Sequence, residues 1–288
     1  MTNQPVDTAN PANTKDLLDD GTLYVARFDE GGKVVWLPLV HGQGPLTAEN
    51  GFNSQADVVI EARRAGDLLG ATKMDRAEDV APNPKTNKVY ALFTNNSRRK
   101  ADQIDAANPR AENKFGHIIE MTPPDRDHAA REYSWDILVK WGDPSIAEVG
   151  AMCGPGTSKD GWFGMPDNCA IDADGRLWVA TDGNSGAATG RADAVWPVET
   201  EGELRGSSWL FFRCPAGAEL CGPTFTRDNK TLFIAVQHRA DDGDHWPAFG
   251  RVSTFEDPST HWPDFQPNMP PRPLLVVITQ EDGGFIGV

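Results

Sequence analysis

The hydrophobic residues of the chain fall in short runs, each bounded by a turn of Asp, Asn, Gly or Pro. The runs are rich in β-branched and aromatic residues, and this combination predicts β-strands rather than helices. The turn Asp174-Gly175 between two such runs is a strong hairpin signal. The predicted strands cover residues 22–28, 34–39, 88–94, 117–121, 134–140, 167–172, 176–182, 208–213, 222–226, 231–237 and 274–279.

One stretch, residues 54–69, has the periodicity of a helix, and Gly70 follows it as a stop signal. The apolar residues that recur there at helical spacing are Val58, Val59, Ala62 and Ala65. The long polar stretch 95–112 has no periodicity, so it is predicted as a loop.

A large aromatic residue recurs just after an Asp, Asn or Gly turn in the second strand of successive hairpins. The aligned segments are Leu23-Tyr24-Val25, Val89-Tyr90-Ala91, Leu177-Trp178-Val179 and Leu232-Phe233-Ile234. Repeated units of two to four strands are typical of a β-propeller. A β-sandwich would give the same strands and turns, but the recurring aromatic position favours the propeller. The sequence therefore predicts an all-β protein, a β-propeller of about four blades with minor helical insertions.

The predicted propeller domain covers residues 19–288, and the polar residues 1–18 are predicted to form a disordered tail. The first repeat has its turn at Asp19-Asp20-Gly21, but no apolar inner strand precedes that turn. The chain is therefore expected to begin in the middle of a blade. Such an incomplete ring has an open edge that needs covering.

The composition limits the partners that the protein can have. The 288 residues carry a formal net charge of -15, which disfavours nucleic acid and anionic membranes because phosphate binding needs a basic surface. No apolar run approaches the roughly 18 residues that a membrane span needs. The first residues lack the charged start and apolar core of a signal peptide.

The four cysteines do not have the spacing of a structural zinc site, because no CxxC pair occurs. Cys214 and Cys221 could close a small disulfide loop. Free buried thiols are the favoured interpretation, because cysteine behaves as a small apolar residue when it is buried.

Polar residues gather where the first strand of each repeat begins. When the repeats are aligned on their turns, Glu78-Asp79 falls opposite Asp167-Asn168 and Cys221-Gly222, with Glu219 two residues earlier. The innermost strands of a propeller line its channel, so these positions are expected to form part of a ring at one end. The predicted ring contains Arg76, Glu78, Asp79, Asp167, Asn168 and Glu219.

Carboxylates that converge in this way repel one another unless a cation lies among them. Their oxygen ligands suit Ca²⁺ or Mg²⁺. The alternative is that each acid caps a strand end and faces solvent. Asp172-Ala173-Asp174-Gly175 resembles the start of an EF-hand loop, but Gly183 stands where that loop needs Glu. This segment is therefore predicted to be a hairpin turn.

Several ordered motifs resemble one known family. They are residues 21–28, 70–76 with Glu78, 108–110 with Asn113 and 116–120, 166–168, and 222–226 with 236–238. Together they resemble the PhoX-type alkaline phosphatases, from about Gly21 to the C-terminus. The resemblance implies a six-bladed propeller that hydrolyses phosphomonoesters.

The resemblance also implies roles for individual residues. Arg76 matches a phosphate-binding arginine of the family. The matches to its metal ligands are Glu78, Asp79 and Asp167, and Glu219 matches the acidic position before Gly-Pro. The implied cofactors are Ca²⁺ and an iron pair, so Fe³⁺ is a second metal candidate.

The family is typically exported by the twin-arginine route, so the resemblance implies a periplasmic or secreted protein, although no signal-peptide pattern is recognised in this sequence. The family's N-terminal half, with further iron ligands including a cysteine, has no counterpart here, and Arg239-Ala240 replaces its usual Pro-Gly after His238. The chain is therefore interpreted either as a fragment or as a subunit that closes its ring as a homo-oligomer.

Two other functions fit the same residues. One is a calcium-dependent propeller lactonase or phosphotriesterase, whose channel acids are similar. The other is a non-catalytic propeller fragment that binds a cation or a partner through the same ring. The favoured hypothesis has a phosphomonoester as substrate and neither nucleic acid nor membrane as partner.

Overall fold

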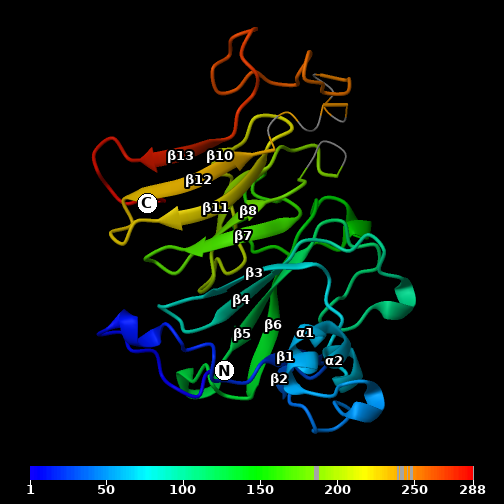
Figure 1. Cartoon of the computed structure of the whole chain (residues 1–288). Coiled ribbons are helices and arrows are strands. Elements are labelled where there is room, and N and C mark those ends of the chain that lie inside the picture. The colour runs from blue at the N-terminus through cyan, green and yellow to red at the C-terminus, as the bar shows by residue number, and fades with distance from the viewer. Residues whose placement is uncertain (185–187, 239, 241–242, 245, 247–248, 288) are drawn as a thin grey trace. The chain divides into compact units, whose positions relative to one another are not determined.

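The structure is a computed structural model that describes the chain except residues 185–187, 239, 241–242, 245, 247–248 and 288 (Figure 1). It contains two compact units. The first comprises Met1–Lys73 and Thr122–Trp135, and the second comprises Met74–Met121 and Asp136–Val288. The propeller domain predicted over residues 19–288 therefore includes parts of both units.

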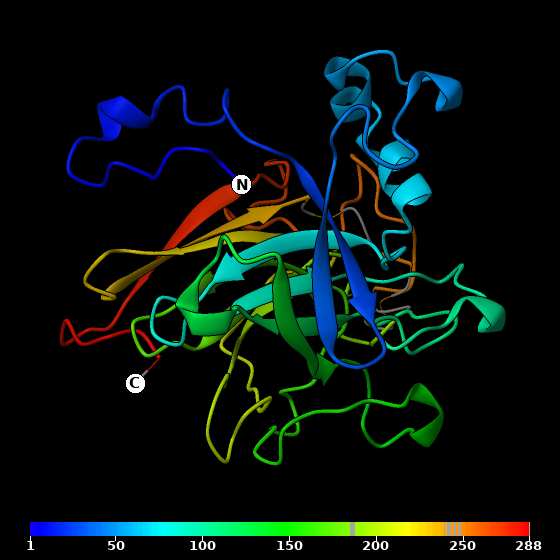
Figure 2. The ribbon, with the colours of Figure 1, turned by 90° about the horizontal axis from the view of Figure 1, so that it is seen from below.

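The first unit is built on a β-hairpin. Strands β1 (Tyr24–Asp29) and β2 (Lys33–Pro38) pair in antiparallel register and lie side by side in both views (Figures 1 and 2). The first residues of β2 pair with the start of β6 (Glu132–Lys140). Residues 1–18 include a short 3₁₀ helix, η1 (Pro11–Thr14), and Thr2 bridges to Gly21.

The helix predicted over residues 54–69 is present in the first unit as two short helices, α1 (Gln55–Ile60) and α2 (Ala62–Leu69). Glu61 separates them because its φ of -97° and ψ of 36° are not helical. The Ser54 hydroxyl caps α1 by accepting from the Asp57 amide, and Gly70 ends α2 at a φ of 77°. Among the described residues, no helix has the length and apolar character required to cross a membrane.

Val58 and Ala65 pack in the core of the first unit with Leu39, Leu46 and Phe52. Val59, which the helical pattern also placed on the apolar face, is exposed.

The second unit contains three sheets. The first has β3 (Ala77–Pro82), β4 (Val89–Phe93), β5 (His117–Thr122) and β6 in the order β6-β5-β4-β3, although β5 ends and β6 begins in the first unit. The second has β7 (Pro166–Ile171), β8 (Leu177–Thr181), β9 (Ala194–Val198) and β10 (Phe212–Arg213). The third has β11 (Glu219–Phe225), β12 (Thr231–Gln237) and β13 (Leu274–Thr279).

The first strands of these three sheets are neighbours, because β7 contacts both β3 and β11 (Figure 1). Antiparallel sheets whose innermost strands follow one another are successive propeller blades. The predicted all-β propeller class is therefore confirmed. The remaining 3₁₀ helices are η2 (Ala48–Asn50), η3 (Ala101–Gln103), η4 (Pro124–Arg126) and η5 (Ala147–Val149).

The repeat prediction is correct for three of its four segments. Tyr90, Trp178 and Phe233 each lie in the second strand of their sheet, β4, β8 and β12. Tyr24 lies instead in β1, the first strand of the hairpin in the first unit. The described residues of the second unit therefore form three blades.

Aromatic residues fill the space between the first two sheets. The Phe163 ring stacks between Trp141 and Trp196, with ring centroids 3.8 and 4.4 Å away. A second cluster surrounds Trp178 with Leu220 and Ile234. All four cysteines are free thiols, so the structure has no Cys214–Cys221 disulfide.

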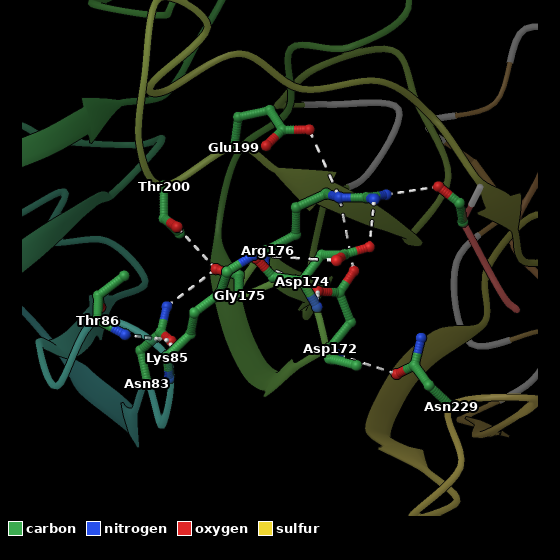
Figure 3. Close-up of polar contacts among 12 residues, drawn as sticks. Asn83, Lys85, Thr86, Asp172, Asp174, Gly175, Arg176, Glu199, Thr200 and Asn229 are labelled. Atoms are coloured by element: carbon green, nitrogen blue, oxygen red, sulfur yellow. Dashed lines mark hydrogen bonds and ion pairs between the residues drawn. The ribbon is translucent and has the colours of Figure 1, made fainter.

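The hairpin turns of the three blades are joined by polar contacts at one end of the strands (Figure 3). The Asn83 amide donates to the Gly175 carbonyl at 2.9 Å, and the Ala173 amide donates to Asn229 Oδ1 at 3.2 Å. Asp172 is used inside its own turn, since it accepts from the amides of Asp174 and Arg176, both at 2.9 Å. The predicted hairpin at Asp174-Gly175 is thus confirmed.

Candidate functional site

Arg76 and three acidic residues lie at the other end of the strands, where the blades begin. Arg76 and Glu78 stand at the start of β3, Asp167 at the start of β7 and Glu219 at the start of β11. Because β8 runs antiparallel to β7, the residue after β8, Asp182, returns to this same end. The turns of Figure 3 lie at the opposite end of the same strands.

The Arg76 guanidinium is held between two carboxylates. Its Nε donates to Glu78 Oε1 at 2.5 Å, and its Nη2 lies 3.5 Å from Asp182 Oδ2. Burial lowers the pKa of Arg76, but the bond to Glu78 and the negative charges of Asp182 and Asp167 outweigh it, so the pKa is raised. Arg76 is therefore a fixed cation whose side chain is still 53% exposed and can contact a ligand.

Asp167 is the buried acid of the cluster, with 7% of its surface exposed. Burial raises its pKa to about 6, and the charges of Glu78, Asp182 and Glu219 add to this rise, while Arg76 opposes it. Like charges this close favour a bound cation or a bound proton. Glu78, Asp167 and Glu219 were predicted to share a ring, and in the structure Glu78, Glu219 and Arg76 all act electrostatically on Asp167.

Asp79 and Asn168, the two other residues of the predicted ring, have different contacts. Asp79 Oδ2 accepts from the Cys169 amide at 2.8 Å, and its Oδ1 accepts from the Val80 amide at 2.7 Å. Asn168 Oδ1 accepts from the Gly222 amide at 3.1 Å. Neighbouring side chains of a strand point to opposite faces, and β3 also has an irregular register between Ala77 and Asp79. Asp79 and Asn168 therefore join adjacent blades, and among the described contacts neither residue bonds to Arg76.

Glu219 is oriented by polar residues at the end of β12. Its Oε1 accepts from Gln237 Nε2 at 2.7 Å, and its Oε2 lies 3.4 Å from His238 Nε2. These contacts fix the carboxylate at the edge of the cluster.

Asp182 is not among the residues of the predicted ring. The ring follows from the first strand of each repeat, whereas Asp182 follows the second strand of its blade. The turn that carries it is held by the buried Asp193. Asp193 Oδ1 accepts from Thr181 Oγ1 at 2.6 Å and from the Asn184 amide at 2.8 Å, and its Oδ2 accepts from the Gly183 amide at 3.1 Å. Burial raises the pKa of Asp193 to about 7, although these hydrogen bonds oppose the rise. The sequence carries one signal for Asp182, since it precedes Gly183 at the end of a predicted strand.

The cluster fits a hard cation in donor type and charge, since it offers carboxylate oxygens and one of them is buried among like charges. Within the part of the chain that the structure describes, no three His, Cys, Asp or Glu side chains converge closely enough to hold a metal ion. The carboxylates of the cluster therefore have the donor atoms that a hard cation needs, but among the described residues they are not arranged as a coordination sphere.

The fold and the site define a β-propeller protein with an arginine among acidic residues at its blade entrances. The family model for alkaline phosphatase PhoX matches residues 1–240. The chain belongs to the PhoX alkaline phosphatase family.

The solved structure of Pseudomonas fluorescens PhoX in complex with vanadate, a transition state analogue, is 33% identical with a TM-score of 0.85. The match covers 99% of this chain and 49% of that chain, so this chain spans about half the length of that relative. An endo-1,5-alpha-L-arabinanase from Thermotoga petrophila RKU-1 aligns with a TM-score of 0.28 and 11% identity, over 74% of this chain and 46% of that chain. A comparison with curated proteins finds no match.

Proposed function

We propose that the chain carries the phosphate-binding part of a metal-dependent phosphomonoesterase. The observation that supports this most is Arg76, held between Glu78 and Asp182 at the blade entrances of a PhoX family member. The related structure contains vanadate as a transition state analogue, so an anion of phosphate-like chemistry is the ligand to test.

In this proposal Arg76 binds the phosphate group of the substrate. A guanidinium offers two parallel N–H donors that match two phosphate oxygens. Glu78 and Asp182 keep the guanidinium in place, so little orientational freedom is lost when the anion binds.

The family depends on metal ions, and the proposed cofactors here are Ca²⁺ and Fe³⁺. Glu78, Asp167 and Glu219 are the proposed ligands, with Asp79 retained from the family motif. When bound, such cations would neutralise the phosphate charge and activate a water molecule. The family also points to a periplasmic or secreted location for the protein.

The test is hydrolysis of a generic phosphomonoester by the purified chain, with and without a chelator. Arg76→Ala is expected to lower kcat/KM by about 100-fold or more, as for loss of a donor that stabilises transition-state charge. The matched control is Arg227→Ala, which removes an exposed arginine at the opposite, turn end of β11 and should leave kcat/KM unchanged. Equal turnover in Arg76→Ala and wild type, or turnover that survives the chelator, would overturn the proposal.

A second candidate is a non-catalytic cation-binding propeller fragment, which is supported by the match to only 49% of the related chain. It predicts that added Ca²⁺ raises the melting temperature while no phosphomonoester is hydrolysed. The lactonase or phosphotriesterase alternative is separated by including a lactone and a phosphotriester in the same assay.

A further inference from the structure

The residue before the proposed phosphate-binding arginine lies in a buried polar network of its own. Asp75 has a fully buried side chain, and both of its carboxylate oxygens are bonded. Arg99 Nε donates to Asp75 Oδ1 at 2.6 Å, and Asn113 Nδ2 donates to Asp75 Oδ2 at 2.9 Å. The Asp75 amide donates in turn to Asn108 Oδ1 at 2.8 Å. Asp75 is thus fixed through its side chain and its backbone.

The three partners Arg99, Asn108 and Asn113 lie between β4 and β5, in or directly after the long polar stretch 95–112. Arg99 also donates to the Gln103 carbonyl at 2.6 Å. Asn113 Oδ1 accepts from the amides of Phe115 and Gly116 at 3.3 and 3.1 Å. A loop without periodicity in the sequence is therefore folded around one buried carboxylate.

This network fixes the backbone that carries Arg76. The Arg76 amide donates to the Asn95 carbonyl at 3.2 Å, and the Thr94 amide donates to the Arg76 carbonyl at 2.8 Å. With Asp75 anchored on one side and Glu78 bonded to the guanidinium on the other, Arg76 has little freedom of position. A buried ion pair is seldom more stable than apolar packing, so stability alone does not account for Asp75 and Arg99.

We propose that Asp75 is a positioning residue for Arg76, acting through the buried contacts with Arg99, Asn108 and Asn113. This inference rests on the proposed function, because it takes Arg76 to be the phosphate-binding group. The network holds the guanidinium where it meets the anion, and an error of about 1 Å in such a group can cost about 100-fold in rate.

The experiment measures vanadate affinity by calorimetry and kcat/KM on a phosphomonoester for three variants. Asp75→Asn places an amide against the Asn113 amide and leaves Arg99 without its carboxylate. Asn113→Asp places a second carboxylate beside Asp75. The exchanged pair, Asp75→Asn with Asn113→Asp, restores one amide donor and one carboxylate acceptor.

Each single variant is expected to bind vanadate at least about tenfold more weakly, and the exchanged pair to regain most of that affinity. When Arg76 is already Ala, Asp75→Asn should cause no further loss, because Asp75 acts through Arg76. Asn83→Ala is the matched control. It removes another buried amide at the turn end of β3, so it should lower the melting temperature without changing vanadate affinity.

Unchanged vanadate affinity in Asp75→Asn, or a loss of the same size in the Arg76→Ala background, would overturn the positioning role. If Asp75→Asn does not fold, the exchanged pair and Asn113→Asp decide the question alone. A wild-type chain that binds vanadate without hydrolysing the ester would refute the phosphatase activity and leave the positioning role standing. Absence of vanadate binding in the wild type would overturn both.

Discussion

Asp167 is buried next to three other carboxylates, which makes the start of β7 unfavourable for the folded state when no cation is bound. Asp167→Asn removes one of these charges and keeps nearly the same shape. In chelator-treated protein at neutral pH, we expect this variant to raise the free energy of unfolding by about 1–2 kcal/mol, as is common when a charged site residue is neutralised. Urea denaturation measures the change. A lower free energy of unfolding in Asp167→Asn would mean that Asp167 stabilises the fold through contacts that its charge makes.

Asp193 provides a pH-dependent test of the turn that carries Asp182. Burial raises its pKa from 3.8 to about 7 in the folded chain. Between these pH values the folded state holds a proton that the unfolded state has released. The free energy of unfolding therefore falls as pH rises from about 4 to about 7, with a slope on the order of 1 kcal/mol per pH unit at most.

In Asp193→Asn this contribution is absent, and the free energy of unfolding should fall less steeply with pH over the same range. Denaturation of both proteins at several pH values gives the two slopes. Parallel slopes would show that Asp193 keeps an ordinary pKa in the folded state.

At the scale of elements, the approach of β4, β5 and β7 depends on one glycine. Gly116 has a φ of 74°, and a Cβ there would lie 2.3 Å from the carbonyl oxygens of Phe93 and Thr94. Gly116→Ala is therefore expected to destabilise the chain by more than about 4 kcal/mol, because it combines backbone strain with a clash.

Gly150 is the matched control, since it has a φ of 62° and nothing within 4 Å of a Cβ. Gly150→Ala should lower the free energy of unfolding by only about 1 kcal/mol, because it introduces backbone strain without a clash. Thermal melting of both variants separates the two contributions, and similar losses in the two proteins would show that the structure relaxes around residue 116.

The elements differ in how far the sequence reveals them. Asp174-Gly175 marks its hairpin because only a few residue pairs suit that turn. Strand β9 was missed, since Pro197 lies inside it and proline usually argues against an inner strand. The predicted strand 208–213 is reduced to β10 (Phe212–Arg213).

The site was predicted to the extent that it follows the strand pattern. Glu78 and Asp167 occupy equivalent positions in successive blades, so an alignment on the turns finds them, and Glu219 lies two residues before the aligned position in the next blade. The contact of Asp182 with Arg76 joins residues 106 positions apart, and the partners of Asp75 come from a loop without periodicity. Such contacts depend on the folded chain, and nothing in the local sequence pattern specifies them.

At the scale of the whole molecule, the net charge of -15 works against compactness through general repulsion. Raising NaCl to about 0.3 M shortens the screening length below about 10 Å and should raise the melting temperature of the metal-free protein by a few degrees. Differential scanning calorimetry at several salt concentrations measures this effect. A melting temperature that does not change with salt would show that repulsion between surface charges contributes little.

A divalent cation should stabilise the chain beyond this screening effect, because it would bind among the carboxylates of Glu78, Asp167 and Glu219. At about 100 times its dissociation constant, a ligand that binds only the folded state adds about 2.7 kcal/mol. We expect Ca²⁺ to raise the melting temperature more than NaCl of the same ionic strength, and a chelator to reverse the rise. Glu78→Gln and Asp167→Asn should each lose most of the Ca²⁺-specific part while keeping the response to NaCl. If Ca²⁺ raises the melting temperature of both variants as much as that of wild type, the cation binds away from the blade entrances. Arg76 would then act without a metal ion beside it.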